Sequence, residues 1–157
     1  MSTAAETKIA EMGLTLPEPA APVASYVPAV EANGLLHISG QLPFVDGKVV
    51  TGKVGDARTL EEGQDAAKAC ALMLLAQMKA ALGDLSRVER IVKLGVFVAT
   101  TPDFTQQPEV ANGASDLMEA VFGDAGKHAR AAVSVPVLPR DATVEVDAVV
   151  KVKAALD

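Results

Sequence analysis

The fold is decided by residues 128–152, HARAAVSVPVLPRDATVEVDAVVKV, in which two apolar segments flank a short polar one. Over residues 143–152, valine or alanine mostly alternates with threonine, glutamate, aspartate or lysine. This period of two predicts a strand with one apolar and one charged face. Residues 130–135 predict another strand, and Pro139-Arg140-Asp141 has the composition of a tight turn. We therefore expect the two strands to form a hairpin.

Two charged side chains stand out in this stretch. Arg130 enters an otherwise small and apolar segment, and Glu145 lies on the charged face of the second strand. Together on one face of the sheet, they would offer a two-point clamp for a carboxylate with a base or water-holder beside it. The alternative is a local salt bridge for Arg130 and a solvated Glu145, since surface ion pairs usually contribute little. The residues alone leave both interpretations open.

The composition favours one domain that associates with copies of itself. The chain has 157 residues, of which 50% are hydrophobic and only 3% aromatic, so alanine, valine, leucine and methionine must build the core. Small side chains bury little area each, at about 25 cal/mol per Å². Burying one sheet face against other subunits would add stability, and a homo-oligomer is therefore expected.

Charge and residue content argue against several classes of protein. The net charge is −6 and no basic stripe is present, which disfavours a nucleic-acid partner. The single cysteine, Cys70, fits a core position in a reducing compartment, and no apolar run approaches a membrane span or a signal peptide. We expect a soluble, cytoplasmic protein. His37 and His128 lack further ligands at metal-binding spacing, so no metal is expected. If the strand already begins at His128, alternation would point its side chain the same way as Arg130, toward the mouth of the site.

The remaining predicted elements have clear local signals. They are, in order, a helix at 3–12 ended by Gly13, strands at 27–31 and 35–39 around Asn33-Gly34, a short strand at 48–50, a helix from Thr59 to Gly83, a strand at 88–99 and a helix at 106–122. Thr59 and Glu62 form a capping box for the long helix. Strict alternation along 88–99 would place Val92 beside Leu94 on one face and Ile91 on the other.

These elements predict an α+β fold. We expect a two-layer sandwich in which a mixed or mainly antiparallel sheet is covered by two helices on one face. The other face, with Arg130 and Glu145, would meet solvent or a partner chain. The N-terminal helix and proline-rich arm, residues 1–21, are expected to lie outside a single domain at 22–157.

A series of short motifs carries a resemblance to a known family. From about Pro22 to Val152 they are Tyr26, the run Ser39-Gly40-Gln41-Leu42-Pro43, residues 92–98 with Asp103-Phe104, Asn112, Ala129-Arg130, Leu138-Pro139 and residues 144–148. In this order and at this spacing the chain resembles the YjgF/RidA family (L-PSP, reactive-intermediate imine deaminases).

The resemblance implies a chorismate-mutase-like fold, assembled as a homotrimer with a central barrel and with clefts between subunits. It also implies hydrolysis of short-lived 2-imino and enamine acids, such as 2-iminopropanoate and 2-iminobutanoate, to 2-keto acids and ammonia, without a cofactor. By position, Arg130 would grip the small carboxylate substrate and Glu145 would position the attacking water. The other residues implied at the cleft are Tyr26, which closes it, Ser39 and Gly40 in its turn, Asn112 at its edge, and Ala132.

Three departures mark a divergent branch and leave the substrate open. His128 stands where similar proteins have proline, Ala131 replaces serine or threonine, and Ala132 replaces cysteine. One alternative function is a trimer that binds or senses 2-keto acids without turnover. Another is the weak endoribonuclease or translation inhibitor after which the family was first named, although the acidic charge counts against it. Glu145 favours hydrolysis, because a protein that only binds the acid has no chemical use for it.

Overall fold

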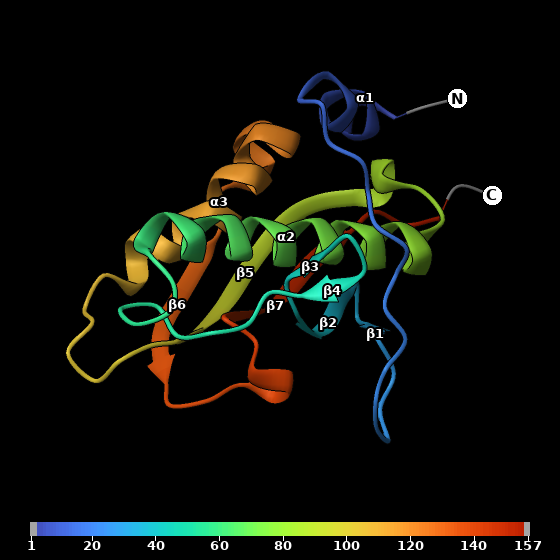
Figure 1. The fold of residues 1–157 in the computed structure, drawn as a ribbon. Helices are drawn as coiled ribbons and strands as arrows, with labels where there is room; N and C mark the ends of the chain where they lie inside the picture. The colour runs from blue at the N-terminus through green and yellow to red at the C-terminus, as the bar shows by residue number, and fades with distance from the viewer. Residues whose placement is uncertain (1–2, 156–157) are drawn as a thin grey trace.

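The computed structural model describes residues 3–155 and contains one five-stranded mixed sheet with helices on one side (Figure 1). The elements are α1 (Ala4–Glu11), β1 (Ala29–Ala32), β2 (Leu35–Gln41), β3 (Phe44–Val45), β4 (Lys48–Val49), α2 (Leu60–Leu82), β5 (Val88–Ala99), α3 (Gln107–Phe122), β6 (Ala129–Val135) and β7 (Val144–Val152). The sheet order is β1-β2-β7-β5-β6, and β5 and β6 form its parallel pair. Strands β3 and β4 form a separate small ladder.

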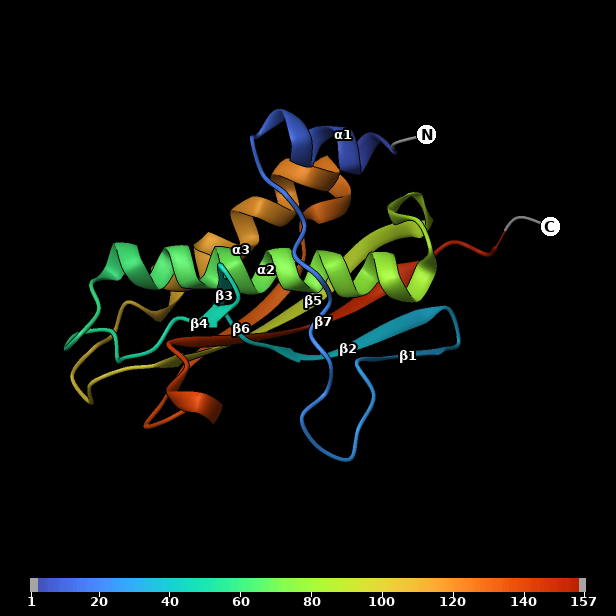
Figure 2. The ribbon, with the colours of Figure 1, turned by 45° about the vertical axis from the view of Figure 1, so that its right-hand side comes forward.

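The predicted two-layer α+β arrangement is confirmed. Helices α2 and α3 lie against the same face of the sheet, and the opposite face is open (Figure 2). Thr59 caps α2 through the expected capping box with Glu62, and Gly83 ends the helix in the left-handed conformation. The turn between β1 and β2 has positive φ at Asn33 (53°) and Gly34 (78°), as a type I′ hairpin requires. The described helices include no segment with both the length and the hydropathy of a membrane span.

The predicted hairpin of residues 128–152 is wrong. The turn at Pro139–Asp141 forms, but β5 lies between the strands that it connects, and Leu94 of β5 pairs with both Arg130 of β6 and Ala148 of β7. Strand β6 is instead the parallel neighbour of β5, and α3 supplies the crossover that a parallel pair needs. A tight turn indicates a reversal of the chain, but it does not show which strand occupies the space between its arms.

The expected alternation along β5 fails in its first half. Ile91 is fully buried whereas Val92 is 36% exposed, the reverse of the expected placing beside Leu94. The pairing of β5 with β7 shifts register between Val88 and Arg90 and again between Ile91 and Lys93. Each irregularity adds one residue to β5 that a strict period of two does not allow for. The first extra residue turns Ile91 to the buried face, and the second returns Leu94 to the face that strict alternation predicts for it.

The N-terminal segment packs on the outer side of the helical layer (Figure 1). Thr3 caps α1 with Glu6, and Ile9 is buried with the main core. The extended arm then crosses α2, where Nε2 of Gln77 donates a hydrogen bond to the carbonyl of Ala20 at 2.9 Å. The division between an arm at 1–21 and a domain at 22–157 stays a prediction about which part folds by itself.

Candidate functional site

The two residues at the centre of the predicted site lie on opposite faces of the sheet. Arg130 is paired with Leu94, whose side chain is buried beneath the helices, and Glu145 is paired with Phe97, three residues further along β5. Paired residues share a face and neighbours along a strand alternate, so Arg130 points toward α3 and Glu145 toward the open face. The expectation that both lie on one face is therefore wrong. Within a single chain the predicted residues form two separate half-sites.

The first half-site, the arginine cluster, consists of Arg130, Asn112, Ser115 and His128. Nη1 of Arg130 donates to Oδ1 of Asn112 at 2.9 Å and to Oγ of Ser115 at 3.0 Å, and Nη2 lies 3.4 Å from the carbonyl of Pro108. All three partners are neutral acceptors. Among residues 3–155, no carboxylate lies within 4.0 Å of this guanidinium. The alternative of a local salt bridge is thus not what the structure contains.

His128 directly precedes β6, and it belongs to the arginine cluster through its hydrogen bonds rather than through alternation within the strand. Its Nε2 lies 2.8 Å from Oγ of Ser115 and its Nδ1 lies 2.6 Å from the carbonyl of Gly126. Ser115 was not among the predicted site residues. Its signal is its position three residues after Asn112 on α3, which places both side chains on one face of the helix.

The arginine cluster lines a surface hollow of about 280 Å³ between α3 and the start of β6. Asp116, Glu119 and Lys127 complete its wall. Lys127 is paired with Asp124 at 3.1 Å and lies 4.0 Å from Glu119, which partly neutralises the rim. Ala132 follows on the same side of β6, where it packs against the main core. The hollow is open to solvent and large enough for a small organic acid.

The second half-site, the glutamate cluster, consists of Glu145, Asp147, Ser39 and Gly40. The pairing of β2 with β7 is irregular between Ile38 and Gln41, and this bulge contains Ser39 and Gly40. A Cβ on Gly40 would overlap the carboxylate of Glu145, so only glycine leaves room for that side chain in its present position. The predicted proximity of the Ser39-Gly40 turn to Glu145 is therefore present within one chain.

Both carboxylates of the glutamate cluster are half-buried side by side on the open face. Partial burial raises the pKa of Glu145 above its ordinary value, and the neighbouring charge of Asp147 adds to this effect. Burial also raises the pKa of Asp147, against a hydrogen bond with the backbone of Gly95 and the charge of Lys93. The alternative of a fully solvated Glu145 does not hold. Asp147 was missed as a site residue, although it follows Glu145 at the spacing of one strand face.

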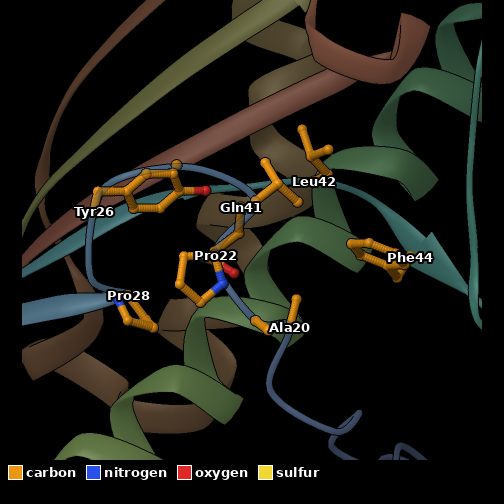
Figure 3. Close-up of a pocket in the computed structure, with 10 residues that line it drawn as sticks. Ala20, Pro22, Tyr26, Pro28, Gln41, Leu42 and Phe44 are labelled. Atoms are coloured by element: carbon orange, nitrogen blue, oxygen red, sulfur yellow. The ribbon is translucent and has the colours of Figure 1, made fainter.

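Tyr26 lies near the glutamate cluster, in the loop that leads from the arm into β1. Tyr26 and Gly40 line the same small, mainly apolar pocket of about 60 Å³, together with Pro22, Pro28 and Phe44 (Figure 3). Oγ of Ser39 donates to the carbonyl of Val27 at 2.8 Å, which fastens this loop to β2. Tyr26 is 45% exposed, so part of its surface is available to a ligand or to another chain.

The other two candidates contribute nothing to either half-site. Cys70 is fully buried and its thiol donates to the carbonyl of Val144 at 3.5 Å. Burial raises its pKa well above the ordinary value, which keeps the thiol protonated, so the prediction of a core residue rather than a nucleophile is confirmed. His37 is exposed on the open face of β2, beside Val30 and Val149. Within residues 3–155, no three His, Cys, Asp or Glu side chains converge as metal ligands would.

Comparison with known proteins gives a consistent set of relatives. Residues 6–151 match the family model described as "YjgF/chorismate_mutase-like, putative endoribonuclease". Protein TCP17 of Trypanosoma cruzi is 53% identical, with 96% of this chain and 98% of that protein covered. The crystal structure of Atu1372 from Agrobacterium tumefaciens, a protein of unknown function, superposes with a TM-score of 0.90 at 47% identity and covers 96% of this chain and 93% of its own.

The RidA protein of the Antarctic bacterium Psychrobacter sp. PAMC 21119 is more distant. Its crystal structure has a TM-score of 0.60 at 26% identity, with 88% of this chain and 96% of that chain covered. The fold is thus shared with RidA, while the details of the chain agree better with Atu1372.

Proposed function

The chain belongs to the YjgF/RidA family, and we propose that it hydrolyses reactive 2-imino and enamine acids to 2-keto acids and ammonia. The proposed site lies between two subunits of a homotrimer. One chain contributes the arginine cluster and its neighbour contributes Tyr26 and the glutamate cluster. This division follows from the placing of Arg130 and Glu145 on opposite faces of one sheet, where a single chain cannot bring them to one small substrate.

The observation that carries the proposal is the uncompensated charge of Arg130. Its guanidinium is held by the side chains of Asn112 and Ser115 and by one carbonyl, none of which neutralises it. Such an arrangement fixes the planar group while leaving its charge for an anion, and a carboxylate fits the fork of donors at two points. A small 2-imino acid supplies this carboxylate next to its reactive carbon.

The reaction needs few catalytic groups, because a protonated imine is already electrophilic. Glu145, as a carboxylate, accepts a proton from a water molecule while the oxygen of that water bonds to C2 of the substrate. The proton is passed on to the amino nitrogen of the resulting carbinolamine. The C–N bond then breaks while the hydroxyl oxygen forms the C=O bond of the 2-keto acid. Glu145 takes up the hydroxyl proton and passes it to the departing ammonia, which leaves as ammonium. The protein supplies orientation, a positioned water and charge balance.

The first prediction concerns assembly. The open sheet face presents exposed apolar side chains, among them Val30 (53% exposed) and Val133 (47% exposed), next to the half-buried carboxylates. Covering this face with other copies would bury that surface, and we expect a trimer with a mass of about three times 16.1 kDa. Light scattering at micromolar concentration measures it. A stable monomer would remove the cleft between subunits and with it the mechanism.

The second prediction tests whether two chains complete one site. Arg130→Ala and Glu145→Gln subunits should each give inactive trimers, whereas trimers that contain both variants should recover turnover. In a closed trimer that contains both variants, one of the three clefts receives its arginine and its glutamate from intact donors, so about a third of the wild-type activity is expected of the isolated mixed trimers. Co-expression with two affinity tags isolates the mixed trimers. If each site lay within one chain, no mixture would regain activity.

A further inference from the structure

We propose that His128 is a positioning residue that holds the guanidinium of Arg130 in place through the hydroxyl of Ser115. The inference rests on the proposed function, because it assumes that Arg130 receives the substrate carboxylate. It adds a role for two side chains that do not themselves touch the substrate.

The donors and acceptors around His128 define a chain of hydrogen bonds with one direction. The carbonyl of Gly126 can only accept, so the proton of the imidazole lies on Nδ1, which is 2.6 Å away. Nη1 of Arg130 can only donate, so Oγ of Ser115 accepts from it at 3.0 Å. The hydroxyl proton of Ser115 is then free to donate to Nε2 of His128 at 2.8 Å. With this tautomer the imidazole completes an uninterrupted series from the guanidinium to a backbone carbonyl.

This series fixes the direction of the lone pair that Ser115 offers to Arg130. A serine hydroxyl without an acceptor rotates among its rotamers, whereas one that is bound to Nε2 keeps its oxygen turned toward the guanidinium. Successive hydrogen bonds also polarise one another in a partly buried setting. Asn112 provides the second fixed contact to the same nitrogen of Arg130. A side chain without an acceptor at position 128 would leave Oγ of Ser115 beside Arg130 but would remove the partner that fixes its direction.

A purely structural role for His128 makes a different prediction. The bond to Gly126 joins residues two apart and ties the start of β6 to the preceding turn, and it needs only Nδ1. The bond to Ser115 reaches across to α3 and needs Nε2. A substitution that replaces only the acceptor Nε2 therefore tests the positioning of Arg130 separately from the local stabilisation that Nδ1 provides.

The experiment compares His128→Phe, which keeps an aromatic ring but no acceptor, with His128→Gln, which keeps an acceptor near the position of Nε2. We expect His128→Phe to raise KM for 2-iminopropanoate and Kd for pyruvate by roughly five- to tenfold, the effect of one net hydrogen bond, with kcat changed less than about twofold. His128→Gln should recover most of this loss. In the Ser115→Ala background, His128→Phe should have no further effect, because its influence passes through Ser115. Unchanged binding in His128→Phe, or full additivity with Ser115→Ala, would overturn the proposal.

The experiment distinguishes a failure of the hydrogen-bond series from a failure of the proposed function. If the wild-type protein neither hydrolyses 2-iminopropanoate nor binds pyruvate, the proposed function is wrong. Nitrogen-15 NMR then tests whether the hydrogen-bond series from Arg130 to Gly126 exists. A proton on Nδ1 of His128, together with guanidinium resonances of Arg130 that shift in His128→Phe but return in His128→Gln, would support the series of hydrogen bonds. A proton on Nε2, or guanidinium resonances that do not change in His128→Phe, would overturn it.

Discussion

Arg130→Ala is expected to lower kcat/KM for 2-iminopropanoate by roughly 30-fold to several thousandfold. Removing one partner of a desolvated charge pair costs about 2–5 kcal/mol of transition-state binding, which corresponds to that range. Binding of pyruvate should weaken to a similar extent, because the product retains the carboxylate. Arg130→Lys keeps the charge but loses the planar fork, so we expect a smaller loss. Release of ammonia above the spontaneous rate measures turnover, since imines also hydrolyse unaided in water.

Arg140→Asn is the matched control for this loss. Arg140 is an exposed arginine in the turn before β7, with φ of 61°, and asparagine removes its charge while tolerating this backbone conformation. If the loss in Arg130→Ala reflected only the overall charge, the control would show it too. Equal activity of wild type and Arg130→Ala would contradict the carboxylate clamp. Loss of turnover with unchanged pyruvate binding would place Arg130 in the chemistry rather than in recognition.

Features that depend on neighbouring residues were predictable from the sequence. The turn at Asn33-Gly34, the capping box at Thr59 and the helix end at Gly83 all form as expected, because the geometry of a turn or a cap is decided within a few residues. The alternation along β7 also holds, because the extra residues of its irregular pairings lie on the partner strands β2 and β5. It is the bulges of β5, which depend on pairing with a distant strand, that the pattern missed.

The relative placing of Arg130 and Glu145 could not be predicted in the same way. Alternation assigns side chains to the two faces of their own strand, but it does not relate the faces of strands that are not neighbours. The insertion of β5 between β6 and β7 depends on long-range packing of α3, which no local signal contains. The error in the predicted hairpin also affected the predicted site, because it placed Arg130 and Glu145 on one face of the sheet. The resemblance implied roles for these residues, and those roles stay predictions, but it did not show that the residues form two separate clusters within one chain.

Glu145→Gln is expected to separate binding from chemistry. Glutamine keeps the shape of the side chain but is not basic, so turnover of freshly generated 2-iminopropanoate should fall by about 100-fold or more. Pyruvate should still bind with nearly wild-type affinity, because Arg130 is intact. A trimer that only binds 2-keto acids would instead show no catalysis in either protein. If Glu145→Gln matched wild type in a working assay, its role in positioning the water would be wrong although the family assignment stood.

The pH dependence of turnover gives an independent test of the ionisation of Glu145. Burial and the charge of Asp147 raise the pKa of Glu145, so the catalytic carboxylate should be lost, as pH falls, at a higher pH than an ordinary glutamate would require. Because the folded protein binds this proton more tightly than the unfolded chain does, ionisation of Glu145 opposes folding above that pKa. Glu145→Gln should therefore be at least as stable as wild type at neutral pH, as thermal unfolding would measure. If Glu145→Gln is inactive yet at least as stable as wild type, its loss of turnover is due to the missing carboxylate. If it unfolds at a lower temperature than wild type, ionised Glu145 does not oppose folding, and the raised pKa is wrong.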